Sequence, residues 1–180
     1  YIVISHKTSL NKLKKTEIIS SILLDPNSMK SIMGGKIKIH KNSILVCADI
    51  LIKYKDRFLL VKRDNVPALG EYWVIGGRIQ RGMSTEEGVK IKVKAECNLD
   101  LKNLKLLNIS RSFWKTDPFN HGKGTDTIQF MYIAEGIGEI KLDKLHSKPI
   151  IVNFEIYKKI KHTLHPYIID FLNLAFTNKN

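Results

Sequence analysis

The sequence predicts an α/β sandwich with a mixed sheet, preceded by a helical arm. Three observations carry this prediction. Apolar and β-branched residues typical of strands fill residues 43–62, a capped helix begins near residue 84 after a glycine pair, and helical segments close the chain. Strands, one central helix, further strands and terminal helices occur in the order typical of an α/β sandwich.

The first part of the chain differs in residue pattern from the rest. We interpret residues 1–40 as an appended helical extension and residues 41–180 as one domain. Ser9 can cap a helix that runs to about Leu24, and Pro26 ends it. We expect this arm to serve dimerisation, so that the protein is a homodimer.

Strands are predicted from Lys36 onwards, where apolar and polar residues alternate. Residues 43–54 form the first long strand, residues 55–57 a turn, and residues 58–62 the returning strand of a hairpin. After a loop, residues 72–75 form a short strand that leads into the glycine pair.

The central helix has clear end signals. Ser84 begins it, and Glu87 three residues later completes a capping box. The helix runs to Glu96 and ends near Asn98, a residue that tolerates the left-handed conformation.

The second half of the chain reads as two strands and two helices. Residues 104–114 and 127–140 are predicted strands, separated by a polar loop with Pro118. Residues 153–176 form two helices broken near Pro166.

Composition excludes some classes of function. The net charge is +13 in 180 residues, but the excess is mostly scattered lysine, which is typical of a solvated surface. Nucleic acid is therefore not the expected partner. Cys47 and Cys97 stand apart, without metal-binding spacing, which indicates a reducing cytoplasmic compartment. No run is apolar enough to cross a membrane, and lysines between residues 12 and 15 interrupt any leader.

Residues 76–99 carry the chemistry. The glycine pair Gly76-Gly77 is predicted to form a turn that exposes backbone close to a ligand. The helix beside it can direct carboxylates, spaced one turn apart, at a divalent cation. A metal ion and a diphosphate are the natural pairing for that layout.

This segment resembles the box of the Nudix hydrolases, G-x5-E-x7-R-E-U-x-E-E-x-G-U, where U is bulky and apolar. Starting at Gly77, the last glutamate of the box is Glu96, but other positions differ from the pattern. These positions hold Met83, Ile91, Lys92, Ala95 and Asn98. The resemblance covers about residues 40–175 and implies a Nudix α/β/α sandwich.

Within that superfamily the chain looks most like the GDP-mannose mannosyl hydrolases. It shares with them Gly76-Gly77-Arg78-Ile79-Gln80, Ala95-Glu96, Gly124-Thr125-Asp126 and Asp49. This resemblance implies a Mg²⁺-dependent hydrolase of a nucleotide sugar, with Mn²⁺ as the alternative ion. Water would attack the sugar anomeric carbon, and a histidine would act as the general base.

The resemblance also implies a set of site residues. The catalytic group comprises His146, Arg78 and Arg63; the metal ligands are Gly76 and Glu96; the substrate contacts are Asp49, Tyr72 and Asp126. For Tyr72, packing in the core is the alternative.

Two departures favour a second interpretation, a Nudix-fold binding module for a nucleotide or RNA with weak or no catalysis. Leu145 stands where the mannosyl branch has a metal-binding glutamine, and Asp143 is a candidate replacement. Lys92 lies one helical turn before Glu96, so its ammonium can compete with a cation for that carboxylate. An ammonium at the metal position would argue strongly against metal-dependent catalysis.

Overall fold

The computed structural model describes residues 34–36, 38 and 40–177. The chain divides into two units, Tyr1–Asn42 and Ser43–Asn180. In the first unit the described residues up to Asn42 are helical, and the Asn42 side chain donates a hydrogen bond of 2.9 Å to the carbonyl of Lys38. The strand expected from Lys36 is therefore wrong. The helix predicted from Ser9 lies outside the described residues.

The second unit is built on one mixed sheet. Its order is β3-β2-β1-β6-β5; in addition, β4 pairs with β1 and β7 pairs with β2. The strands are β1 (Leu45–Tyr54), β2 (Arg57–Arg63), β3 (Tyr72–Trp73), β4 (Ile75–Arg78), β5 (Asp100–Trp114), β6 (Thr125–Ile137) and β7 (His146–Val152). Strands β1 and β6 run parallel, and the other pairs are antiparallel.

The predicted hairpin joins β1 and β2. Lys55 and Asp56 make its turn with φ of 49° and 62°, the positive values that a tight hairpin turn requires. The turn sets the register, with Tyr54 opposite Arg57.

The sheet forks along one edge of β1. Near the hairpin, β1 pairs with β2 from Ile52 to Tyr54, but from Cys47 to Ile50 it pairs with β4 instead. Strand β2 diverges from β1 there and pairs with β3 at Val61 and Lys62. It also pairs with β7 from Phe58 to Arg63, which places Arg63 opposite His146. We call this region, where β2 and β4 separate beside β1, the fork. It brings together polar residues from strands that are distant in sequence, such as Arg63 and His146.

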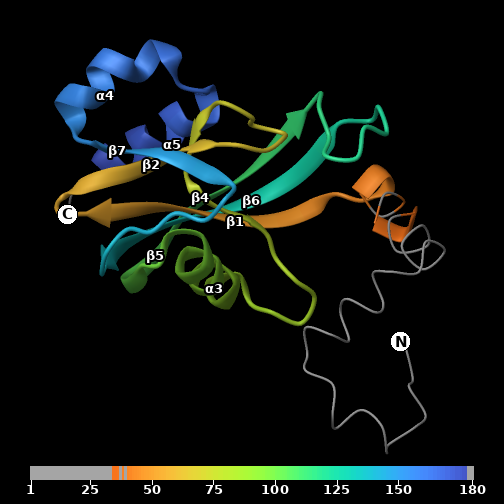
Figure 1. Ribbon diagram of the computed structural model, residues 1–180, viewed down its shortest axis with the longest axis horizontal. Helices are drawn as coiled ribbons and strands as arrows, with labels where there is room; N and C mark the ends of the chain where they lie inside the picture. The colour runs from red at the N-terminus through yellow and green to blue at the C-terminus, as the bar shows by residue number, and fades with distance from the viewer. Residues whose placement is uncertain (1–33, 37, 39, 178–180) are drawn as a thin grey trace, which may run out of the picture. The chain divides into compact units, whose positions relative to one another are not determined.

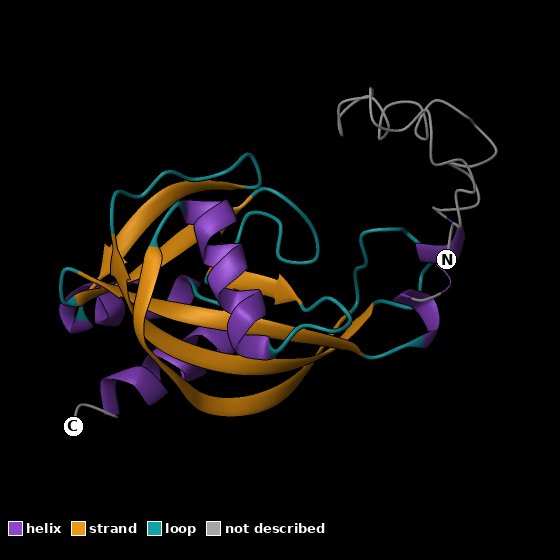
Figure 2. Ribbon diagram, turned by 90° about the horizontal axis from the view of Figure 1, so that it is seen from below, coloured by secondary structure: helices purple, strands orange, loops and turns teal. Residues whose placement is uncertain are grey.

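Helices cover both faces of the sheet, with α3 on one face and α4 and α5 on the other (Figures 1 and 2). They span Thr85–Cys97 (α3), Phe154–Ile160 (α4) and Pro166–Thr177 (α5), and the short 3-10 helix η2 (Lys161–Thr163) lies between the last two. Under α3 the buried core includes Val89 and Val93; under α5 it includes Ile168 and Phe171. The predicted α/β/α sandwich is confirmed.

Two details differ from the prediction. Gly76 and Gly77 lie inside β4 rather than in a turn, because β4 must approach β1 closely there. No strand was predicted for β7, because Ser147, Lys148 and Pro149 are not typical of a strand. An edge strand such as β7 tolerates polar residues and proline. Within the described residues no helix is both long and apolar enough to cross a membrane.

Candidate functional site

Helix α3 is held at both ends by its own sequence. The Ser84 side chain accepts a hydrogen bond from the backbone N–H of Glu87 at 3.2 Å, and the Glu87 carboxylate accepts one from the Ser84 backbone at 3.0 Å. Asn98 ends the helix in the left-handed conformation, with φ of 61°. Glu96 therefore lies in the last turn, with Lys92 one turn before it.

The Lys92 ammonium lies beside the predicted metal ligand. It donates a hydrogen bond to Glu96 Oε1 at 3.3 Å, and both side chains are largely shielded, with 27% and 14% exposed. It also lies 3.4 Å from the point where a Cβ on Gly77 would stand. Lys92, Glu96 and Arg78 are among the residues that line an open cavity of about 200 Å³.

The second oxygen of Glu96 faces the predicted general base. Glu96 Oε2 is buried and makes no hydrogen bond within the described residues. His146 Nε2 lies 4.0 Å away, and the His146 side chain is 6% exposed. A buried carboxylate oxygen without a partner is costly, which is typical of functional sites.

Asp143 orients His146. Its Oδ1 lies 2.7 Å from His146 Nδ1. We assign the proton to Nδ1, because a carboxylate can only accept, and this leaves Nε2 able to accept a proton. Asp143 also accepts a hydrogen bond from the Leu145 N–H at 3.0 Å, and its own N–H donates to the carbonyl of Glu96 at 3.0 Å. The loop before β7 is thereby tied to the end of α3.

Arg63 supplies a second cation at the fork. Its Nε and one terminal nitrogen donate to Asn65 Oδ1 at 3.1 and 2.8 Å, which fixes the guanidinium plane. Burial lowers the pKa of Arg63, and the nearby Asp49 and Glu96 carboxylates oppose that shift. An arginine stays protonated despite such shifts, so Arg63 is a permanent positive charge.

Asp49 is the most buried carboxylate of the site. Burial raises its pKa from 3.8 to about 6, although the hydrogen bond from Tyr167 and the charge of Arg63 favour the ionised form. The Tyr167 hydroxyl donates to Asp49 Oδ2 at 3.0 Å, and its ring stacks on Trp73 at 5.0 Å. A Cβ on Gly76 would come within 2.5 Å of Asp49 Oδ1, so only glycine fits opposite Asp49.

The structure thus gathers some of the predicted site residues and separates others. His146, Arg63, Asp49, Gly76 and Glu96 lie around the fork, and Arg78 lines the cavity beside Glu96.

Two predicted substrate contacts have other partners. Tyr72 packs against the apolar core under α5, its expected alternative. Asp126 forms a two-point ion pair with Arg111, at 3.0 and 2.7 Å.

The donor set does not fit a divalent cation. Magnesium takes six oxygen ligands in octahedral geometry, of which several are usually waters and one or two are carboxylates with free oxygens. The described part of the chain holds no group of three or more His, Cys, Asp or Glu side chains that could bind a metal ion. Lys92 already occupies the accessible oxygen of Glu96, and Leu145, which cannot ligate, is 48% exposed.

Sequence reasoning missed two contacts of the candidate site. Asp143 was considered as a metal ligand, whereas it pairs with His146; the three-residue spacing of the two was the only signal. Tyr167, which caps Asp49 from α5, gave no signal, because the two are far apart in sequence.

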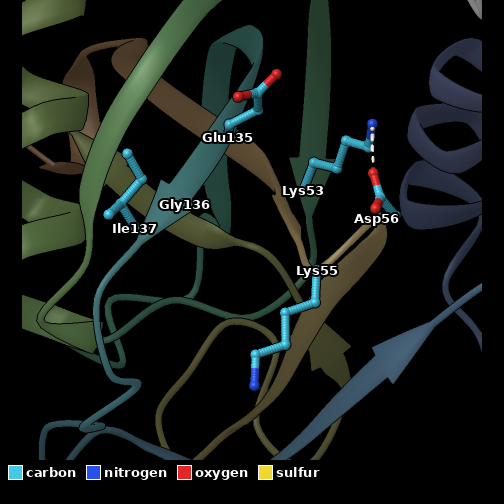
Figure 3. A pocket seen from close by; sticks show the side chains of 6 residues that line it. All are labelled: Lys53, Lys55, Asp56, Glu135, Gly136 and Ile137. Atoms are coloured by element: carbon cyan, nitrogen blue, oxygen red, sulfur yellow. Dashed lines mark ion pairs between the residues drawn. The ribbon is translucent and has the colours of Figure 1, made fainter.

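A separate depression lies at the β1–β2 turn (Figure 3). It has a volume of about 270 Å³ and is lined by Lys53, Asp56 and Glu135 among others. Its ion pair between Lys53 and Asp56, at 3.1 Å, joins two exposed side chains. None of the predicted site residues lines it.

Solved structures identify the architecture. A Nudix hydrolase of Nitrosomonas europaea is similar with a TM-score of 0.62 at 15% identity, covering 77% of this chain and 92% of that one. The Nudix domain of Shewanella oneidensis NrtR, complexed with ADP ribose, gives 0.58 at 15% identity and covers 91% and 99%. The second unit therefore has the Nudix fold, as predicted.

Among curated proteins the chain is similar to the low-salt glycan biosynthesis protein Agl8 of Haloferax volcanii. The two are 24% identical over 136 residues, which span 73% of this chain and 82% of Agl8. No model of a protein family matches the chain.

Proposed function

We propose that the protein hydrolyses a nucleoside diphosphate derivative, specifically a nucleotide sugar of the GDP-mannose type. The observation that carries this proposal is the buried His146, whose Nδ1 lies 2.7 Å from Asp143 Oδ1 while its Nε2 lies 4.0 Å from Glu96 Oε2. A histidine held in one tautomer by a carboxylate is the arrangement that a general base requires.

In the proposed step, water attacks the anomeric carbon of the sugar. His146 Nε2 accepts a proton from the water as its oxygen bonds to the carbon. The bond between that carbon and the diphosphate oxygen breaks, and its electron pair leaves with the nucleoside diphosphate. The imidazolium then returns its proton to solvent. In this proposal Arg78, which lines the cavity, and Arg63, which is buried near Asp49 and Glu96, stabilise the leaving diphosphate.

The relatives support this substrate class. Agl8 is named for glycan biosynthesis, and the NrtR domain was solved with ADP ribose, a nucleoside diphosphate joined to a sugar. Contacts of the substrate with Asp49, Tyr72 and Asp126 remain predictions, as do the homodimer and the cytoplasmic location.

One observation favours the second candidate, a nucleotide-binding module without turnover. The ion pair with Lys92 occupies one carboxylate oxygen of Glu96, the side chain that the resemblance assigns to the metal ion. The two candidates differ in whether products form.

The test is hydrolysis of GDP-, ADP- and UDP-sugars in ¹⁸O-labelled water, with and without Mg²⁺. We expect free labelled sugar and unlabelled nucleoside diphosphate; label in a phosphate would instead place the attack at phosphorus. His146→Gln should lower kcat by about 10²–10⁴-fold. His162→Gln is the matched control, because His162 is exposed in η2. Binding without any turnover would establish the second candidate.

Asp143 is a positioning residue in this proposal. Asp143→Asn should lower kcat with little change in KM and should alter the pH profile, since an amide can hold the ring in the wrong tautomer. Equal losses in His146→Gln and His162→Gln would refute the base assignment.

A further inference from the structure

We propose that the Lys92 ammonium takes the place of a divalent cation, so that this site binds the diphosphate of its ligand without a metal ion. The inference rests on the proposed function for the presence of a diphosphate in the cavity. It differs from what the family resemblance implies, because that resemblance includes Mg²⁺ as a cofactor.

The position of the ammonium is the first argument. Lys92 Nζ lies 3.3 Å from Glu96 Oε1 and 3.4 Å from the point where a Cβ on Gly77 in β4 would stand. These are the helix and the strand that the family resemblance assigns to metal binding. The Lys92 side chain is only 27% exposed, so the charge is enclosed by the site rather than spread over the surface.

The helix holds the ammonium there. Glu96 lies in the last turn of α3, where the partial negative charge of the helix end disfavours a carboxylate. Lys92, one turn earlier on the same face, offsets that unfavourable charge. The ion pair between Lys92 and Glu96 therefore stabilises the helix.

The charge of the cavity is the second argument. Its lining includes two cations, Arg78 and Lys92, and a single carboxylate, Glu96. A surplus of cations attracts a diphosphate and repels a divalent cation. An ammonium has three donors; among the described residues Glu96 takes one, which leaves two for phosphate oxygens. Charge-assisted bonds of this kind stabilise a leaving diphosphate as its charge grows.

Calorimetry with ADP, GDP and UDP as probes tests the inference directly. We expect the wild-type chain to bind at least one of them equally well in EDTA and in Mg²⁺. Lys92→Met, which keeps the length and removes the charge, should weaken binding in EDTA by at least tenfold. Lys94→Met is the control, because Lys94 lies on the same helix in an exposed pair with Asp100.

A reversal variant gives a second readout that needs no substrate. Lys92→Glu places two carboxylates one turn apart, so this variant should bind Mn²⁺, and Mg²⁺ should raise its Tm. Neither ion should change the Tm of the wild-type chain or of Lys94→Glu.

The outcomes separate the two proposals. Binding that depends on Lys92 and survives EDTA, without hydrolysis, would support this inference and refute the enzyme. Hydrolysis only with Mg²⁺ would support the enzyme and overturn this inference. Diphosphate binding lost in EDTA, no binding of any probe, or Mn²⁺ binding by the wild-type chain would also overturn it.

Discussion

Replacement of Asp49 by asparagine should stabilise the protein at neutral pH and have little effect in acid. The buried Asp49 carboxyl has its pKa raised from 3.8 to about 6, because burial outweighs the hydrogen bond from Tyr167 and the charge of Arg63. An asparagine can still accept that hydrogen bond through its side-chain oxygen.

The magnitude follows from proton linkage. Below pH 4 the carboxyl is largely protonated in the folded and unfolded chains, so its burial costs little. As the pH rises the unfolded chain loses the proton first, so the penalty on the folded state grows until the pH passes about 6 and then stays constant. The rise of this pKa from 3.8 to about 6 corresponds to about 3 kcal/mol at pH 8, falling to under about 1 kcal/mol at pH 4.

Urea and thermal unfolding of both proteins from pH 4 to pH 8 measure this difference. At pH 8 we expect Asp49→Asn to raise Tm by roughly 6–12 °C. Asp100→Asn, at a carboxylate with 71% of its side chain exposed, is the control and should change Tm little. A variant less stable than wild type at pH 8 would refute the reasoning, because the attraction between Asp49 and Arg63 would then exceed the cost of burial.

Three further predictions concern stability and thiol reactivity. Gly76→Ala should cost about 3 kcal/mol or more in urea unfolding, because its Cβ would meet backbone atoms at 2.5–2.6 Å and its φ is +152°; Gly70→Ala, with open space around it, shares the positive φ and should cost less. Ser84→Ala should cost about 1 kcal/mol through loss of the capping box; an unchanged urea midpoint would show that the cap adds nothing. Burial raises the pKa values of Cys47 and Cys97 to about 12 and 11, so neither should react with a thiol reagent until urea unfolds the chain; fast labelling of the native protein would contradict this.

Local signals made most of the fold predictable. Ser84, Glu87 and Asn98 specify both ends of α3 within one short segment, and the structure agrees at each. The β1–β2 hairpin was equally accessible, because its turn and both strands are adjacent in the chain.

Contacts between distant segments were not predictable in the same way. Glycine usually marks a turn, so Gly76 was assigned to one; its actual requirement is the close approach of Asp49 from a neighbouring strand. The Tyr167 contact with Asp49 joins α5 to β1 and leaves no pattern in either segment. Asp143 and His146 were each noticed, but only the folded loop shows that one orients the other.

The pairing of β1 with β6 and of β2 with β7 also constrains when the site can form. The first hairpin and the β5–β6 pair involve neighbouring segments, whereas Leu45 must find Thr127, and Arg63 must find His146. Closing such long loops costs chain entropy before the contacts they bring together can stabilise the fold, and this slows folding. On the ribosome, β1 and α3 emerge long before β7 and α5. The histidine and the tyrosine that complete the site therefore arrive last, and a chain shortened before Tyr167 would leave Asp49 without its buried partner.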